Sequence, residues 1–97
     1  MIVNLFCANG FTSSMLRNKI REEAKKKGLD YQVDAFPYSE IGEQGAKADI
    51  ILLGPQIRYN LKHVQEQFPD KKVILIDMKT WGATDGAKVV SQIEGLE

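Results

Sequence analysis

The chain has 97 residues, of which 43% are apolar and 27% charged, a composition typical of one small globular domain rather than of a disordered segment. Thirteen basic and thirteen acidic side chains give a net charge of zero, so nothing in the charge indicates a nucleic-acid partner. One cysteine cannot form an intrachain disulfide, and no apolar run approaches the roughly 20 residues that span a bilayer. We therefore expect a single cytoplasmic domain, residues 1–97, without membrane insertion.

Four apolar runs predict β-strands at residues 2–7, 31–36, 49–54 and 72–77, because they are rich in Val, Ile and aromatic residues. The third run is continuously apolar, as expected for a parallel strand that is covered on both faces. The second run alternates between apolar and polar residues, which is typical of a strand at the edge of a sheet.

Apolar residues three or four positions apart predict helices between and after these strands. They form three stripes: Leu16, Ile20 and Ala24; Ile57, Leu61, Val64 and Phe68; and Ala87, Val90, Ile93 and Leu96. Gly28 and Pro69 follow the first two stripes and are expected to end those helices. Residues 37–48 predict either a short helix or an irregular crossover, because Gly42 and Gly45 disfavour a helix.

This alternation predicts an α/β fold, namely a small four-stranded parallel sheet with helices on both faces. A flavodoxin-like strand order, 2-1-3-4, places the alternating strand at an edge and the most apolar strand inside. In such sheets ligands bind at the switch point, beyond the carboxyl ends of strands 1 and 3. The loops at that point contain residues 7–14 and 54–59, so Cys7 lies in the expected active-site position.

The loop after Cys7 has the residues of a phosphate-binding cradle. It consists of Ala8, Asn9, Gly10, Phe11, Thr12, Ser13 and Ser14. The first amides of a helix lack intrahelical partners, and Gly10 permits a positive φ, so consecutive amides can surround an anion. The three hydroxyl side chains can cap the helix or donate to the anion. A phosphate-sized anion could bind here without a cationic side chain.

The same local field favours the thiolate form of Cys7, and a thiolate beside a phosphate cradle is a nucleophile toward phosphorus. The alternative is a buried, unreactive cysteine followed by an ordinary helix cap. That alternative leaves unexplained why the single thiol, a glycine and three hydroxyls coincide at the switch point.

Low-molecular-weight tyrosine phosphatases and arsenate reductases also place a cysteine in a phosphate loop after strand 1. Those phosphatases need an arginine six residues after the cysteine, and here that position is Ser13. Without a guanidinium group, water attack on a phosphocysteine loses its main transition-state stabiliser. The sequence therefore favours a phosphoryl carrier. A small cysteine phosphatase or arsenate reductase and a non-enzymatic flavodoxin-like binding module stay open as alternatives.

Four segments resemble the IIB component of the bacterial phosphoenolpyruvate-dependent sugar phosphotransferase system, of the lactose/cellobiose type and nearer its cellobiose/chitobiose branch. They are LFCANGFTSSML (5–16), DAFPY (34–38), ADIILLGPQIRY (48–59) and the pair Asp85-Gly86. The resemblance extends over essentially the whole chain, and the cysteine loop together with GPQI-x-Y is specific.

The resemblance implies a phosphotransferase that forms a phosphocysteine on Cys7 and uses Ala8 to Ser14 as its phosphate loop. It implies that a phosphohistidine on a IIA protein donates the phosphoryl group. A sugar such as cellobiose or chitobiose, held by the membrane IIC protein, then receives it. No cofactor or metal is implied. We expect a monomer with small, transient interfaces that meets the inner face of the membrane only through IIC.

Further candidates follow strands 3 and 4. Gln56, Arg58 and Tyr59 could line the crevice, with Gln56 donating to the phosphate and Arg58 meeting an acidic partner or the incoming phosphohistidine site. Alternatively, Pro55 simply starts a helix and Arg58 is solvated. Asp77 is expected to have a capping or turn role, His63 to be a surface or half-buried residue and Trp81 to have a packing role.

Overall fold

The computed structural model describes residues 1–8 and 11–95, and the side chains of all of these except Phe11 and Thr12. In chain order its elements are β1 (Ile2–Cys7), α1 (Phe11–Lys26), β2 (Gln32–Pro37), the 3-10 helix η1 (Tyr38–Glu40), α2 (Ile41–Lys47), β3 (Ile50–Leu53), the 3-10 helix η2 (Pro55–Asn60), α3 (Leu61–Gln67), β4 (Lys72–Leu75), α4 (Met78–Gly82) and α5 (Gly86–Glu94).

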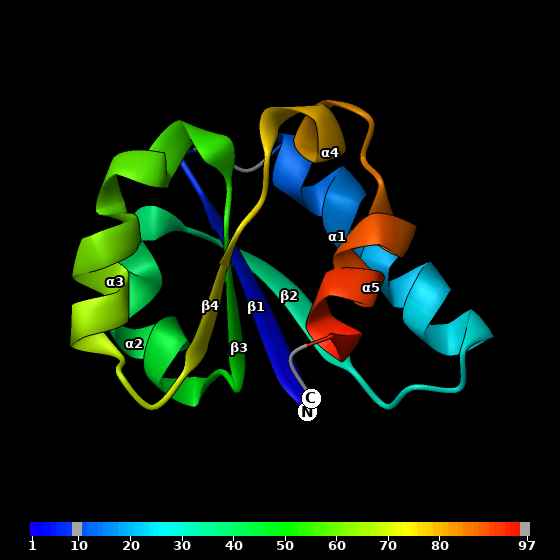
Figure 1. Cartoon of the computed structure of the whole chain (residues 1–97), viewed down its shortest axis with the longest axis horizontal. Coiled ribbons are helices and arrows are strands. Elements are labelled where there is room, and N and C mark those ends of the chain that lie inside the picture. The colour runs from blue at the N-terminus through cyan, green and yellow to red at the C-terminus, as the bar shows by residue number, and fades with distance from the viewer. Residues whose placement is uncertain (9–10, 96–97) are drawn as a thin grey trace.

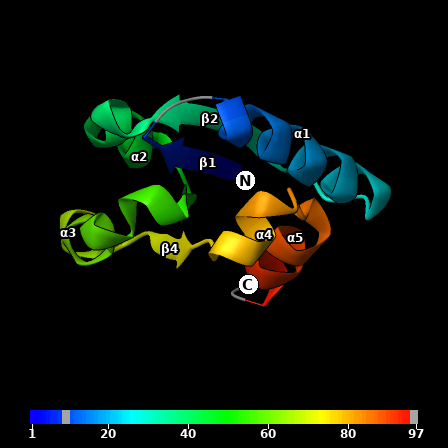
Figure 2. The ribbon, with the colours of Figure 1, turned by 90° about the horizontal axis from the view of Figure 1, so that it is seen from above.

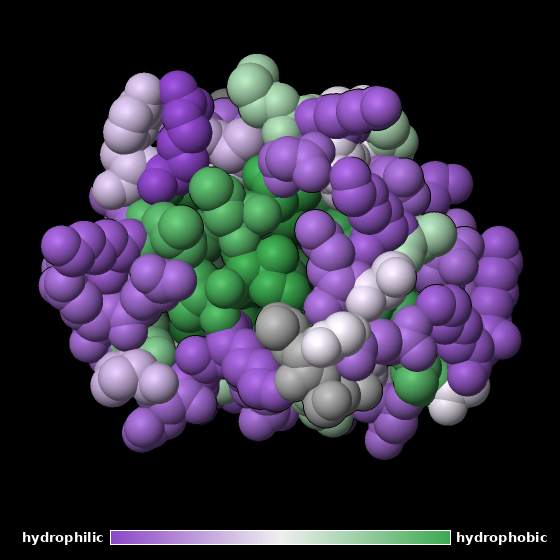
Figure 3. Space-filling view, in the orientation of Figure 1, coloured by the Kyte–Doolittle hydropathy of each residue, from purple (hydrophilic) through white to green (hydrophobic). Residues whose placement is uncertain are grey.

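The four strands form one parallel sheet in the order β2-β1-β3-β4, which confirms the predicted topology and the edge position of the alternating strand. Helices α2 and α3 cover one face of the sheet, and α1, α4 and α5 cover the other (Figures 1 and 2). β4 is the second edge, and its Val73, Ile74 and Leu75 are only half-buried. Hydrophobic side chains accordingly gather on the surface over this strand (Figure 3).

Side chains of alternate strand residues enter two separate cores. The α1/α5 core contains Val3, Leu5, Cys7, Leu16, Ile20, Val33, Ile50, Leu52, Ile76, Trp81, Val89, Val90 and Ile93. The α2/α3 core contains Phe6, Ile41, Ala48, Ile51, Leu53, Ile57 and Val64. Neighbouring residues of β3, Leu52 and Leu53, are both fully buried but on opposite faces, so each strand serves both cores.

Helix α1 has the predicted buried stripe, since Leu16, Ile20 and Ala24 are at most 2% exposed. The helix ends as expected at Gly28, which has a positive φ of 70°. The amide of Leu29 then donates to the carbonyl of Ala24 at 2.8 Å, which satisfies one carbonyl of the last turn. The buried stripe seats the whole helix on the face of the sheet to which Cys7 belongs.

Within the segment 37–48, residues 38–47 are helical and form η1 and α2, which is one of the two predicted forms. Gly45 is buried, and a Cβ at this position would lie 2.9 Å from two carbons of the Phe68 ring. The glycine therefore allows α2 to pack directly on the ring. Its role is close packing, not interruption of the helix.

The prediction for the last helix was partly wrong. α5 buries Gly86, Val89, Val90 and Ile93, whereas Ala87 is exposed and Leu96 lies outside the described residues. The reason is the contact at Gly86, where a Cβ would lie 2.6 Å from the carbonyl oxygen of Lys19 in α1. Because this contact turns Gly86 toward α1, the buried stripe continues through Val89 rather than starting at Ala87.

The short helix α4 was not predicted. Asp77 caps it, accepting a hydrogen bond from the Thr80 amide at 2.7 Å, which confirms the capping role expected of this residue. The strands before it are also shorter than predicted, because β3 and β4 end at Leu53 and Leu75. Among the described residues, no helix is long and apolar enough to cross a membrane.

Candidate functional site

Cys7 is the last residue of β1 and its side chain is 1% exposed, in the α1/α5 core. In the β1–β2 ladder it lies opposite Pro37. On the other side the amide of Gly54 donates to the carbonyl of Phe6 at 2.9 Å, which continues the β1–β3 ladder past Leu53. Cys7 therefore lies at the carboxyl ends of the two central strands, at the switch point of the sheet.

Helix α1 begins at Phe11, directly after the loop that follows Cys7, and its first turn contains no acidic residue. Ala8 is an exposed bend, Ser13 is 1% exposed and Ser14 is half-buried. Asn9 and Gly10 lie outside the described residues, as do the side chains of Phe11 and Thr12. The amino end of a helix carries unpaired amides and a partial positive charge, and no carboxylate in this first turn competes for them.

The predicted residues Gln56, Arg58 and Tyr59 all lie in η2, which follows β3 at the same end of the sheet, and all three are exposed. Although Arg58 is exposed, its side chain is held by contacts within the protein. Its guanidinium donates to the Pro55 carbonyl at 3.1 Å and to the Tyr59 hydroxyl at 2.8 Å, and it lies 4.5 Å from the centre of the Tyr59 ring. Arg58 and Tyr59 thus form one preorganised exposed pair.

The remaining candidates have structural surroundings. The Thr80 amide, helped by Lys88 at 3.4 Å, holds the pKa of Asp77 below its usual value, because both stabilise the carboxylate. His63 is exposed on α3, as expected. Trp81 is 6% exposed and packs in the same core as Cys7, which confirms its packing role.

Sequence reasoning missed one contact at the carboxyl end of β3, the contact between Trp81 and Gly54. A Cβ on Gly54 would lie 3.0 Å from two carbons of the Trp81 ring. The residues are far apart in the sequence, and the only signal is that a glycine stands between an apolar strand and a proline. The contact brings α4 to the end of β3.

A surface hollow of about 370 Å³ lies elsewhere, between α1 and the start of α5, and Cys7 does not line it. Both of its cations are paired, Lys19 with Glu22 at 3.7 Å and Lys26 with Glu23 at 3.3 Å, and Asp85 adds a third carboxylate to its lining. Among the described residues there is also no cluster of three His, Cys, Asp or Glu that could hold a metal ion. We therefore base the candidate site on the position of Cys7 rather than on the size of a cavity.

A cysteine that ends the first strand of a 2-1-3-4 parallel sheet, ahead of a helix amino terminus, defines a class of flavodoxin-like proteins that includes the low-molecular-weight phosphatases. Within that class, a match to one protein family identifies this chain more narrowly. The family model described as "PTS system, Lactose/Cellobiose specific IIB subunit" matches residues 2–92, and the chain belongs to this family.

Characterised relatives agree with the assignment. The chain is 31% identical to the oligo-beta-mannoside-specific EIIB component of Bacillus subtilis (strain 168), over 95% of this chain and 91% of the relative. It is 29% identical to the galactose-specific EIIB component of Lactococcus lactis subsp. cremoris, over 98% and 94%. The cellobiose-specific EIIB component of Lactococcus lactis subsp. lactis is also 29% identical, over the same shares.

Solved structures show the same fold. The lactose-specific IIB domain of Streptococcus pneumoniae superimposes with a TM-score of 0.88 at 18% identity, covering 98% of this chain and 95% of that one. The cellobiose-specific IIB protein of Borrelia burgdorferi gives a TM-score of 0.70 at 27% identity, covering 94% and 87%. The chain is thus a IIB phosphotransferase component of sugar uptake, as the sequence resemblance indicated.

Proposed function

We propose that Cys7 is the phosphoryl carrier of this IIB component. The observation that carries the proposal is the position of the thiol at the carboxyl end of β1, just before the amino end of α1, whose first turn has no acidic residue. An anion attached to the sulfur would lie at the amino end of α1, where the positive end of the helix dipole favours negative charge. Each hydrogen bond to a charged acceptor contributes roughly 1.5–3 kcal/mol.

The proposed chemistry has two balanced steps. In the first, the Cys7 sulfur attacks the phosphorus of a phosphohistidine on a IIA protein, so an S–P bond forms as the N–P bond breaks. The thiol gives up one proton and the imidazole gains one. In the second, a sugar hydroxyl held by the IIC protein attacks the same phosphorus, so an O–P bond forms as the S–P bond breaks, and the released sulfur takes up the proton that the hydroxyl loses. Positioning and electrostatic stabilisation provide most of the catalysis in such transfers.

A carrier must hold its phosphoryl group without losing it to water. In the related phosphatases an arginine occupies the position of Ser13, where it stabilises the transition state of hydrolysis. Here Ser13 is 1% exposed and cannot supply a guanidinium group. A phosphocysteine on this chain would therefore persist until a sugar arrives, which supports the carrier over the phosphatase and arsenate-reductase alternatives.

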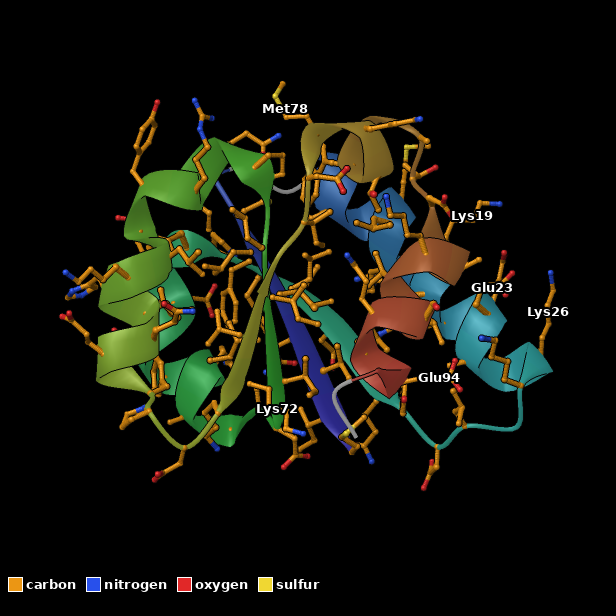
Figure 4. The ribbon with its side chains drawn as sticks, viewed as in Figure 1. Lys19, Glu23, Lys26, Lys72, Met78 and Glu94 are labelled. Carbon is orange, nitrogen blue, oxygen red and sulfur yellow. The ribbon has the colours of Figure 1, made fainter. Side chains whose placement is uncertain are left out.

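Three exposed apolar side chains support docking of the IIA and IIC proteins around Cys7. Met15 in the first turns of α1, Tyr59 in η2 and Met78 in α4 are 61%, 82% and 73% exposed. All three elements border the carboxyl end of the sheet, where Met78 projects away from the fold (Figure 4). With the Arg58–Tyr59 pair, they offer an apolar and basic rim to two cytoplasmic surfaces that meet this monomer in turn.

We infer that the sugar is a β-linked disaccharide such as cellobiose or chitobiose. The inference is supported by the names of two relatives, which are specific for oligo-beta-mannosides and for cellobiose. A galactose-specific relative of similar identity makes galactose the competing substrate. Uptake assays with a matching IIC protein and each of these sugars would decide between them, and phosphorylation of galactose alone would overturn the inference.

The test of the carrier is the intact-protein mass after incubation with phosphoenolpyruvate, the general phosphotransferase proteins and a cellobiose-type IIA protein. We expect one added phosphoryl group on the wild type and none on Cys7→Ser, whose hydroxyl is a poorer nucleophile at neutral pH. Addition to both proteins, or to neither while IIA is phosphorylated in the same tube, would contradict the role of Cys7.

A further inference from the structure

Gly54 leaves space for two side chains. Its backbone is extended, with φ −68° and ψ 154°, a conformation that any residue adopts, so the backbone does not require glycine here. A Cβ at this position would lie 2.8 Å from Oε1 of Gln56 and 3.0 Å from two carbons of the Trp81 ring. The Trp81 ring would have to give by a few tenths of an ångström, and the Gln56 amide, at the end of a flexible side chain, would have to move away. Glycine therefore leaves room for the amide and the ring in the place that a side chain would take.

This space lies beside the Cys7 side chain. Phe6 is paired with Leu53, so the next pair along the β1–β3 ladder is Cys7 and Gly54. Leu52 points into the core that contains Cys7 and Leu53 into the other, and by alternation position 54 faces the same side as Cys7. Neighbouring strands are about 4.8 Å apart. The Gln56 amide and the Trp81 ring therefore lie next to the thiol on the thiol's own face of the sheet.

Trp81 and Gln56 differ in burial. Trp81 is 6% exposed, and its helix is fixed by the Asp77 cap and by the bond from the Asp85 amide to the Thr80 carbonyl at 3.0 Å. Gln56, in contrast, is exposed. The ring is thus part of the buried core, whereas the Gln56 side chain is accessible from outside.

We propose that Gln56 contacts the phosphoryl group on Cys7 through its side-chain amide, and that Gly54 is a positioning residue because its missing side chain leaves room for this amide. The proposal rests on the proposed phosphocysteine. A primary amide has two N–H donors, and half a turn of the amide brings Nε2 to the place of Oε1. Being neutral, it adds a donor without the charge that would promote hydrolysis in the manner of an arginine.

The experiment measures single-turnover phosphoryl transfer from phosphorylated IIA to Cys7 at several IIA concentrations, for the wild type, Gln56→Ala and Gly54→Ala. We expect both variants to lose about tenfold in the maximal rate, because one hydrogen bond to the charged group is lost, with an unchanged half-saturating IIA concentration. A raised half-saturating concentration with an unchanged maximal rate would assign Gln56 to docking and overturn the proposal.

Gly45→Ala is the matched control, because its Cβ also meets an aromatic ring, that of Phe68 at 2.9 Å, but in the opposite core. Gly45→Ala should lose about as much stability as Gly54→Ala, but the phosphoryl group should reach Cys7 at the wild-type rate. Equal slowing in both glycine variants would show that the rate follows stability and would overturn the proposal.

Trp81→Phe provides a second, independent variant. It removes the far ring carbons that crowd position 54, so the double variant Gly54→Ala/Trp81→Phe should regain stability relative to Gly54→Ala. Its transfer should stay slow, because the new methyl group still displaces the Gln56 amide. Recovery of the rate along with stability would contradict the role of Gln56. If the wild type itself gains no phosphoryl group on Cys7, the proposed function fails and this inference with it; if only the variants are unaffected, this inference alone fails.

Discussion

Each face of the sheet contains a close contact between a glycine and an aromatic ring, but the two contacts have different surroundings. On one face Gly45 makes room for the ring of Phe68, and on the other Gly54 makes room for the ring of Trp81. The first contact joins α2 to the end of α3 within a purely structural core. The second lies at the end of the strand pair that carries Cys7. A close glycine–aromatic contact thus does not by itself indicate a functional site, and only the second of these contacts lies at the carboxyl end of the strand pair that contains Cys7.

The largest effects should come from two adjacent leucines that serve opposite faces. Leu52→Ala and Leu53→Ala should each lower the free energy of unfolding by roughly 2–5 kcal/mol, because both side chains are fully buried. Urea unfolding would measure these losses. Only Leu52→Ala should also speed alkylation of Cys7 by iodoacetamide under native conditions, because only Leu52 shares its core. Equal acceleration of Cys7 alkylation in both variants would show that the packing on one face of the sheet depends on the packing on the other.

Gly86→Ala should have the next largest effect, and on the Cys7 face alone. The added Cβ would meet backbone atoms of Lys19 and Ile20, which cannot move aside as a flexible side chain can. We expect a loss of roughly 1–3 kcal/mol in urea unfolding. Gly82→Ala in α4 is the control, because nothing lies within 4 Å of its Cβ, and it should be neutral or slightly stabilising. A Gly86→Ala protein of wild-type stability would mean that α5 can shift away from α1 without cost.

Gly28→Ala tests backbone conformation without any packing change. A Cβ here would meet nothing within 4 Å, but the φ of 70° is unfavourable for alanine. The expected loss is roughly 1–2 kcal/mol. Gly28→Asn should lose less, since asparagine tolerates this region better. Equal losses for Ala and Asn would indicate that crowding, not φ, sets the cost.

The smallest effect should depend on pH and concerns the cap of α4. The Thr80 amide and Lys88 lower the pKa of Asp77 below 3.8, so this carboxylate stabilises the fold at pH values above about 4. Asp77→Asn keeps the cap but removes the charge. It should be slightly less stable than the wild type at pH 7, and the difference should vanish as the pH falls through the lowered pKa. Lys88→Met should lower the stability at pH 7 by less than Asp77→Asn does. A stability difference between Asp77→Asn and the wild type that persists at low pH would refute this account.

Local patterns predicted the sheet well. Four apolar runs and the helical stripes between them were sufficient for the strand order and for the position of Cys7. The stripe of α1 was predicted residue by residue, because a long helix on one face repeats its pattern several times. The resemblance of the cysteine loop to the IIB family was also confirmed.

What could not be predicted depends on contacts between distant residues. Ala87 was assigned to the buried stripe because nothing local reveals that Gly86 is pressed against α1. Helix α4 is a single capped turn, too short for a periodic pattern. The contact of Trp81 with Gly54 is visible only in the fold. The chemistry of Cys7, the partners and the monomeric state remain predictions.

The position of α4 and α5 in the chain has a consequence for the newly made protein. During synthesis β1, β2 and β3 leave the ribosome first and can pair, but Trp81 and α5 follow only after all four strands. Until they arrive, the side of the sheet that contains the cysteine has no cover except α1. The side chain of Cys7 is thus least covered while the chain is still growing, and the segments made after β4 complete the core around it.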